Sequence, residues 1–215
     1  MKAMLYADWI SLKQVLRSFL FAAVIIMGTG FLWNGPTFFV MGLLMLSILV
    51  PVSLCSADKA HGWDKLSLSM PVLRRDVVGS KFAVSGMANA AVLAIAVVLA
   101  AIYCGLHPEE DWMSNLAALL AGEAIALVMM GVDLCVSYKW GLEKARYILM
   151  GCVWLPMIGV VLLDKVGIGL PDLSWLELLN AAQIVGLAAG AVVVGLLVYL
   201  FCCMVSVRVY QRTEL

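Results

Sequence analysis

Charged residues are scarce in this 215-residue chain. Asp, Glu, Lys and Arg together make up 13% of it, whereas hydrophobic residues make up 64%, and the mean hydropathy is +1.03. A soluble globular domain carries about 25% charged residues, so this composition excludes an ordinary soluble protein and favours an all-α membrane protein. The 14 basic and 14 acidic residues cancel. A neutral chain gives no reason to expect nucleic acid as a partner.

Residues that build catalytic and metal sites are equally scarce. The two histidines, His61 and His107, belong to no H-E-x-x-H motif, and the six cysteines include no C-x-x-C pair. A zinc centre or a disulfide framework is therefore not expected. No G-x-S-x-G elbow is present, and Gly79-Ser80-Lys81 lacks the preceding glycine and the residue order of a phosphate-binding loop. We expect no catalytic residue, no metal and no cofactor on this chain.

Long uncharged runs divide the chain into candidate membrane spans, because a helix needs about 20 apolar residues to cross a bilayer. The run between Arg17 and Asp58 is too long for one crossing, and Asn34-Gly35-Pro36 near its middle would reverse the chain. Four further runs follow. The pattern predicts one transmembrane domain over residues 1–215, with six helices at about 18–33, 36–56, 78–106, 115–138, 147–163 and 178–207.

The basic residues predict which side of the membrane each loop faces. Six spans place both termini on one side, and if that side is the cytoplasm, 13 of the 14 Lys and Arg residues lie inside, with Lys165 outside. Short cytoplasmic loops are enriched in Lys and Arg. We therefore expect a multi-pass protein of the cell membrane, plasma or inner, with both termini in the cytoplasm.

Residues 1–17 precede the first predicted span and carry both charged and apolar side chains. Leu5, Trp9, Leu12 and Leu16 recur at spacings of three and four, which places them on one face of a helix. This pattern predicts an amphipathic helix that lies along the inner surface of the membrane, in contact with lipid.

A charged stretch, residues 58–81, interrupts the apolar sequence after the second predicted span. It holds five of the 14 basic residues, one tryptophan and Pro71. Because proline disrupts the interior of a helix, we expect a short cytosolic helix near 57–68 and a second helix that begins near Leu73. Trp63 on the short helix would suit either the groove of a partner protein or the lipid surface, and both interpretations stay open at this point.

Two acidic residues, Glu123 and Asp133, lie within the fourth predicted span. A charged side chain at the bilayer centre costs about 2.5–3.5 kcal/mol on insertion scales, so both should face protein or water. They either take part in helix packing or line a polar transport path. In the sixth predicted span, Gly186 and Gly190 have the GxxxG spacing that suits helix packing within the chain or contact with another subunit.

The two cytosolic loops resemble those of a known family, the compact six-span permeases of the type-2 ABC exporters. That family carries a W-D-x-x-x-x-S-x-P-x-x-R-x-x-x-V-x-x-K pattern after its second span, and this chain matches it at Trp63, Asp64, Ser69, Pro71, Arg74, Val78 and Lys81. Residues 139–146, KWGLEKAR, resemble the basic cluster that follows the fourth span there. Leu73 departs from the small polar residue that is usual before the arginine.

The resemblance implies the permease subunit of an ATP-driven exporter, which pairs with a second copy or a paralogue around the substrate path. Its short cytosolic helix would be a coupling helix, seated in a separate ABC ATP-binding subunit that holds ATP and Mg. The residues implied in contact with that subunit are Asp58, Lys59, His61, Trp63, Asp64, Lys65, Leu66, Pro71, Arg74 and Arg75. The second cytosolic loop would contribute Lys139, Glu143, Lys144 and Arg146, and the candidate polar residues of the path are Glu123 and Asp133.

Two other functions remain as alternatives. A secondary transporter would use Glu123 or Asp133 as a proton or ion site, but the two halves of the chain show no internal repeat. A membrane protein without transport activity, such as an immunity or scaffold protein, would also fit the composition. A gene for an ATP-binding subunit beside this one would favour the exporter, and its absence would favour the last alternative.

Overall fold

The computed structural model describes residues 6, 8–10, 19, 21–26, 28, 36–60, 74–107, 111–152, 154 and 180–212. All regular structure among them is α-helical, which confirms the predicted all-α class for this part of the chain. The long helices are α2 (Pro36–Ala60), α4 (Arg74–Leu106), α5 (Trp112–Trp140) and α8 (Ala181–Arg212), and residues 142–152 are also helical. Much of the first and fifth predicted spans lies outside the described residues.

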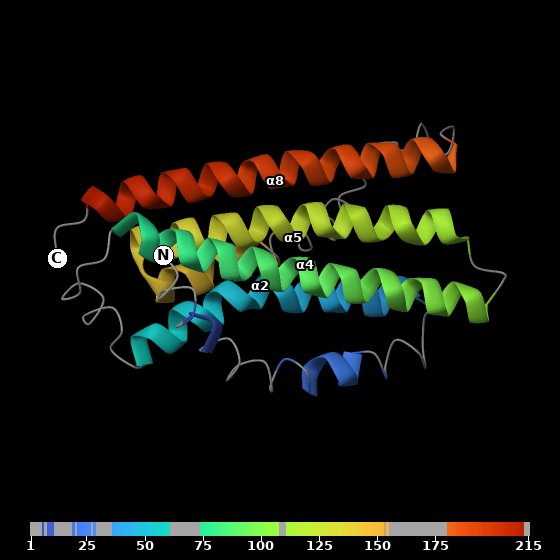
Figure 1. The fold of residues 1–215 in the computed structure, drawn as a ribbon, viewed down its shortest axis with the longest axis horizontal. Helices are drawn as coiled ribbons and strands as arrows, with labels where there is room; N and C mark the ends of the chain where they lie inside the picture. The colour runs from blue at the N-terminus through green and yellow to red at the C-terminus, as the bar shows by residue number, and fades with distance from the viewer. Residues whose placement is uncertain are drawn as a thin grey trace, which may run out of the picture.

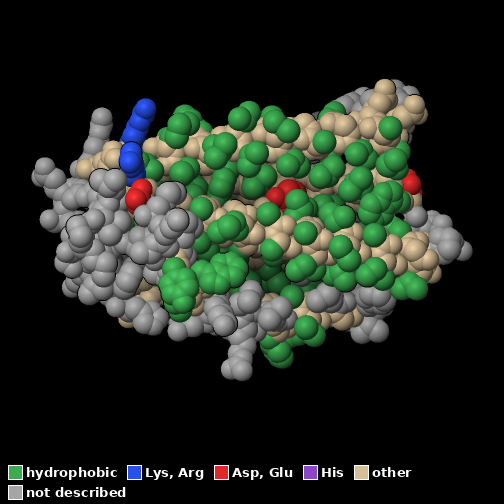
Figure 2. Space-filling model, in the orientation of Figure 1, with side chains coloured by type: hydrophobic (Ala, Val, Ile, Leu, Met, Phe, Trp, Pro, Cys, Tyr) green, Lys and Arg blue, Asp and Glu red, His purple; other side chains and the backbone are tan. Residues whose placement is uncertain are grey.

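Three of these helices are long and apolar enough to cross a membrane: Arg75–Leu106, Trp112–Trp140 and Ala181–Gln211. They contain most of the segments predicted as the third, fourth and sixth spans. Many of their large apolar side chains are exposed, among them Val98, Ile125 and Phe201. Figure 2 shows hydrophobic side chains along the length of one face of the bundle, basic side chains at one end, and acidic side chains at both ends and near the middle. Such a surface suits a lipid environment.

The helices lie side by side in an elongated bundle (Figure 1). α4 runs opposite to α2, α5 and α8. α5 packs against α2, α4 and α8, most extensively against α8. α2, α5 and α8 therefore end where α4 begins. We call this end of the bundle the charged end, because it carries the exposed side chains of Lys59, Arg75, Lys139 and Arg208.

Local signals set the ends of α5 and α8. Asp111 precedes α5, and its carboxylate accepts a hydrogen bond from the Met113 backbone N–H at 3.2 Å. Gly141 follows α5 with a φ of 87°, a backbone conformation that glycine adopts without steric cost. Asn180 precedes α8, and its backbone N–H donates to Gln183 Oε1 at 3.0 Å, which is half of a capping box. The polar residues that flank these apolar segments therefore fix where each helix begins or ends.

α2 extends beyond the second predicted span. The sequence pattern assigned residues 57–60 to the start of a separate cytosolic helix, whereas the structure continues α2 through them to Ala60. No proline or glycine interrupts this part of the helix, and Lys59 in the last turn interacts favourably with the helix dipole. The rest of the predicted cytosolic helix lies within residues 61–73, outside the described residues.

Close backbone contact joins α5 to α8. A Cβ atom on Gly195 would lie 3.0 Å from the Ala124 carbonyl oxygen, and one on Gly131 would lie 3.2 Å from the Tyr199 Cα. Small residues of this kind allow membrane helices to approach closely. The Tyr199 hydroxyl also donates to the Phe82 carbonyl at 2.7 Å, which ties α8 to α4 within the core.

Candidate functional site

A buried ionic cluster occupies the charged end of the bundle. The Lys81 ammonium lies 3.2 Å from Asp8 Oδ1 and also pairs with Asp58 Oδ2. The Ser80 hydroxyl donates to Asp8 Oδ2 at 2.6 Å. Asp8, Asp58 and Lys81 are only 4%, 5% and 4% exposed. Charges this deeply buried are tolerated because they are paired and hydrogen-bonded.

The ionic cluster joins three segments that are far apart in the sequence. Asp58 lies in the last turn of α2, Lys81 lies about two turns into α4, and Asp8 belongs to the N-terminal segment. Residues 61–73, the predicted site of contact with an ATP-binding subunit, connect α2 to α4. The ion pair between Asp58 and Lys81 therefore joins the two helices that flank residues 61–73.

The residues predicted to contact a partner have different surroundings in the structure. Lys59 and Arg75 are exposed at the charged end, Arg74 begins α4, and Asp58 is buried in the ionic cluster. The remaining six residues lie outside the described residues: His61, Trp63, Asp64, Lys65, Leu66 and Pro71. Their contact with a partner stays a prediction.

Residues 139–146, predicted as the second cytosolic loop, are helical apart from a tight turn at Gly141. α5 ends at Trp140, and helical structure resumes at residue 142 after Gly141. Lys139, Glu143, Lys144 and Arg146 are all exposed, and the Arg146 guanidinium donates to the Ser56 hydroxyl at 2.9 Å. Both predicted loops are thus attached at the charged end, next to the end of α2.

A second buried polar group lies farther along the bundle, where three helices meet. The Ser47 hydroxyl on α2 donates to Asn89 Oδ1 on α4 at 2.7 Å, and Asn89 Nδ2 donates to Glu123 Oε1 on α5 at 2.5 Å. We call these residues the central polar chain. All three are at most 3% exposed, and Glu123 Oε2 has no hydrogen-bond partner within the described structure.

The central polar chain and the ionic cluster share one face of α4. Lys81, Ser85 and Asn89 follow each other at intervals of four residues, so their side chains lie along the same side of the helix. All three are buried, and the Ser85 hydroxyl has no partner in the described part of the chain. A buried polar row therefore runs along α4 from the charged end to Glu123.

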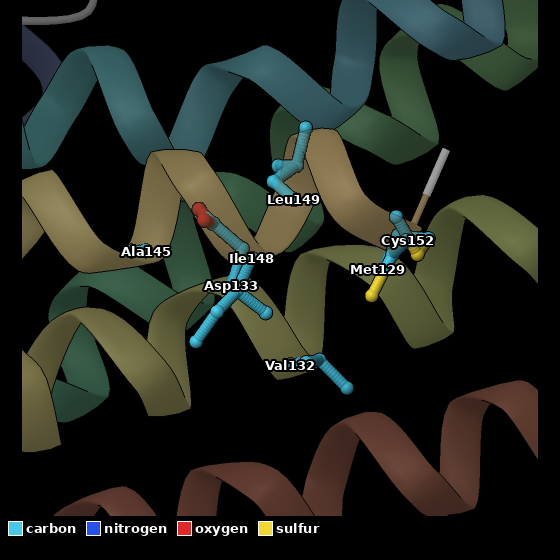
Figure 3. A pocket seen from close by; sticks show the side chains of 7 residues that line it. All are labelled: Met129, Val132, Asp133, Ala145, Ile148, Leu149 and Cys152. Carbon is cyan, nitrogen blue, oxygen red and sulfur yellow. The ribbon is translucent and has the colours of Figure 1, made fainter. Parts of the chain in front are cut away.

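Asp133 lies on α5 with 3% exposure, and its carboxylate points toward the helical residues 142–152 (Figure 3). Neither carboxylate oxygen has a hydrogen-bond partner among the described residues. A pocket of about 10 Å³ lies beside it, lined by Met129, Val132, Asp133, Ala145, Ile148, Leu149 and Cys152. This volume is close to the minimum that one water molecule needs. A carboxylate in such surroundings either holds a proton or meets a cationic group.

Sequence reasoning missed several of these polar residues. Asp8 lies within the predicted amphipathic helix, and Ser47 and Asn89 lie within apolar runs, so the sequence pattern assigns no partner to any of them. Lys81 was recognised as part of a motif but was given no role. The four-residue spacing of Lys81, Ser85 and Asn89 was the signal available, because polar residues with that period on a membrane helix share a face.

The described residues bring together no group of three or more His, Cys, Asp or Glu side chains that could hold a metal ion. All six cysteines lie among the described residues as free thiols, and Cys202 is the buried one. Glu123 and Asp133 therefore stand out as acidic groups without a neighbouring set of metal ligands.

Comparison with known proteins identifies a family. The sequence model of a family described as ABC-2 family transporter protein matches residues 3–211. No curated protein and no solved structure gives a significant match. The family match covers both predicted cytosolic loops, the ionic cluster and the central polar chain.

Proposed function

This chain belongs to the ABC-2 family of transporter proteins, as the resemblance of its loops predicted, and we propose that it is one half of an ATP-driven exporter. In this proposal the permease pairs with a second copy or a paralogue, and the pair encloses the substrate path. A separate ABC ATP-binding subunit binds ATP and Mg and supplies the energy. The family match over nearly the whole chain is the observation that carries this proposal.

The proposed placement has six helices in the cell membrane with the charged end in the cytoplasm. The distribution of basic residues supports it, since 13 of the 14 fall on one side when six spans are drawn. The exposed Lys59, Arg75, Lys139 and Arg208 at the charged end agree with the same orientation. Both termini would then lie in the cytoplasm, and residues 1–17 would lie along the inner membrane surface.

The ATP-binding subunit would bind at the charged end. Residues 61–73 would form most of the coupling segment, with Trp63 as the apolar anchor in a groove of that subunit. Lys59 and Arg75 flank this segment and are exposed, so they are accessible to a partner. The neighbouring turn would add Lys139, Glu143, Lys144 and Arg146 to the same surface.

The transport path would use the acidic residues of α5. Glu123 and Asp133 each keep at least one carboxylate oxygen without a hydrogen-bond partner in the described structure, although both are buried. Groups of this kind within a membrane are costly unless they meet a ligand, water or a proton. A substrate with a cationic and an apolar part would suit these two carboxylates and their apolar neighbours.

Affinity purification from a gentle detergent tests the proposal. A tag on this chain should recover an ABC ATP-binding subunit and a second permease chain in defined proportions, measured by mass spectrometry and native mass. Trp63→Ala should lose the ATP-binding subunit, whereas Trp154→Ala, which alters an exposed tryptophan outside the predicted loops, should keep it. Purification of wild-type protein without any ATP-binding chain would contradict the proposal.

A second candidate function, secondary transport, is favoured by one observation: Glu123 and Asp133 have carboxylate oxygens without a hydrogen-bond partner in the part of the chain that the structure describes. Proton coupling requires an ionisable carboxylate, so Glu123→Gln and Asp133→Asn would abolish export at normal protein level. If the protein is an ATP-driven exporter, the purified complex should instead still hydrolyse ATP when it carries either substitution. Loss of the export phenotype in cells, together with the absence of any ATP-binding partner, would favour the second candidate.

A further inference from the structure

Lys81 is the last residue of the loop motif that begins at Trp63, but the proposed contact with an ATP-binding subunit gives it no role. Its side chain is 6% exposed, so it offers no surface to a partner. Its ammonium instead pairs with two carboxylates, one from the N-terminal segment and one from the end of α2. Lys81 therefore acts inside this chain.

The geometry makes Lys81 the shared partner of two other segments. Asp8 and Asp58 carry like charges, and each is paired with the same ammonium group. Without that ammonium the two carboxylates would repel each other in surroundings of low dielectric constant. Ser80 adds a hydrogen bond to Asp8 from the same turn of α4. Lys81 is therefore a contact that the N-terminal segment and α2 share.

Two helices can be held together by a single ion pair, but this cluster contains a third member. The Lys81–Asp58 pair alone would join α2 to α4 on either side of residues 61–73. Asp8 adds the N-terminal segment, whose described residues Tyr6 and Trp9 are exposed. The two helices that flank residues 61–73 are therefore connected to each other and to the N-terminal segment through buried polar contacts.

We propose that Lys81 is a positioning residue that holds the N-terminal segment and the adjoining ends of α2 and α4 together as one rigid block. This inference rests on the proposed function, because the loop would be displaced by the ATP-binding subunit. The block transmits that displacement to α2, α4 and the N-terminal segment simultaneously. Lys81 neither binds ATP nor contacts the partner, and its effect on transport comes through Asp8 and Asp58.

Spin-label distance measurements test whether the block is rigid. Labels at Tyr6→Cys and Ala60→Cys, both at exposed positions, are introduced into a variant without its six native cysteines. The purified complex with its ATP-binding subunit is studied in nanodiscs, without nucleotide and trapped with Mg, ATP and vanadate. We expect one narrow distance in both states, because Lys81 fixes the two labelled segments to each other.

Three variants decide between a positioning role and a purely local one. In Lys81→Met the distribution of distances between the two labels should become broad, and ATP hydrolysis should no longer be coupled to the change between the nucleotide-free and the trapped state. Lys81→Arg keeps a cation at this position and should retain the narrow distance and the coupling. Asp8→Asn leaves Lys81 paired with Asp58, so it keeps the fold and should broaden the same distance. If Lys81→Met fails to fold, the label distance in Asp8→Asn tests the positioning role. Arg208→Met, at an exposed cation of the same end, is the matched control and should change nothing.

The inference is overturned by either of two results. One is a wild-type distance that shifts between the two nucleotide states, and the other is a narrow distance retained in Asp8→Asn or in folded Lys81→Met. Failure of the proposed function gives a different result, since no ATP-binding subunit would then copurify with the wild-type chain. In that case, the distance between the two spin labels in the permease alone, without nucleotide, would still show whether Lys81 holds the N-terminal segment to the end of α2.

Discussion

The ionic cluster and the acidic residues of α5 are both buried, but they differ in how their charges are satisfied. At the charged end, Asp8 and Asp58 both pair with Lys81, and Ser80 adds a hydrogen bond. Farther along the bundle, Glu123 has one bonded oxygen and Asp133 has none in the described structure. The two regions are therefore equally buried, and they differ in the ion pairs and hydrogen bonds that their carboxylates make.

This difference separates carboxylates that are paired within the chain from carboxylates that have oxygens without a partner among the described residues. A buried carboxylate with a cation beside it contributes to a defined geometry. A buried carboxylate without a partner is a cost to stability, and helix packing by itself would be served better by an apolar residue. Loss of a partner should therefore destabilise the charged end, whereas loss of an acidic group on α5 should not. The expected effects of mutation follow from this contrast.

The largest effect is expected from removal of the Lys81 ammonium. Lys81→Met removes an ammonium group that pairs with both Asp8 and Asp58 in the buried cluster, and breaking a buried ion pair costs about 3–5 kcal/mol. Unfolding in mixed micelles with increasing SDS should show this loss in the free energy of unfolding. Arg208→Met, which removes an exposed cation, should stay within about 0.5 kcal/mol of wild type. Equal stability of the two variants would show that the cluster is not a structural attachment.

Much of the fold follows from the sequence because its signals are local. The apolar runs, with Asp111 and Gly141 at the ends of α5, mark long helices without any knowledge of their neighbours. The charges of Asp58 and Lys59 suggested that a new helix begins near residue 57. This prediction was wrong, since α2 continues to Ala60. Asp58 instead stays in α2 and reaches Lys81. The pairing partner lies on another helix, and periodicity within one segment carries no information about it.

The candidate site was less predictable than the fold. The sequence marked Glu123 and Asp133, because acidic residues are rare in membrane spans. It did not reveal that Asn89 binds one of them while the other lies beside an apolar pocket. Such differences depend on which helices meet at each level of the bundle. Asp8 could not be paired with Lys81 from the sequence, since 73 positions separate them.

The same chemical change should have opposite consequences in the two regions. Asp58→Asn removes a charged partner of Lys81 and should cost about 1.5–3 kcal/mol, as expected for a hydrogen bond to a charged group. Asp133→Asn removes a carboxylate that has no hydrogen-bond partner among the described residues, so it should raise the free energy of unfolding by about 1 kcal/mol. Melting temperatures of both variants in the same detergent check the sign. A similar loss in both would contradict the distinction between paired and unpartnered carboxylates.

The central polar chain should behave as an intermediate case. Asn89→Ala removes the only described partner of Glu123 Oε1 and leaves the whole carboxylate unsatisfied, which should cost about 1–3 kcal/mol. Ser85→Ala, one turn away on the same face, removes a hydroxyl that has no hydrogen-bond partner among the described residues, and it is the matched control. SDS unfolding should separate the two variants. If Ser85→Ala were as destabilising as Asn89→Ala, the loss would reflect packing rather than the bond to Glu123.

The smallest effects are expected at two glycines of α8, one in close contact with α5 and the other with no described atom beside it. Gly195→Ala places a Cβ about 3.0 Å from the Ala124 carbonyl oxygen, so α5 and α8 must separate slightly, at a cost of about 1 kcal/mol. At Gly190 a Cβ meets no described atom within 4 Å, and Gly190→Ala should gain up to about 1 kcal/mol from helix propensity. Thermal unfolding in detergent measures both. If Gly190→Ala instead destabilises a dimer seen by native mass while the monomer keeps its stability, the Gly186 and Gly190 face contacts a second subunit rather than lipid.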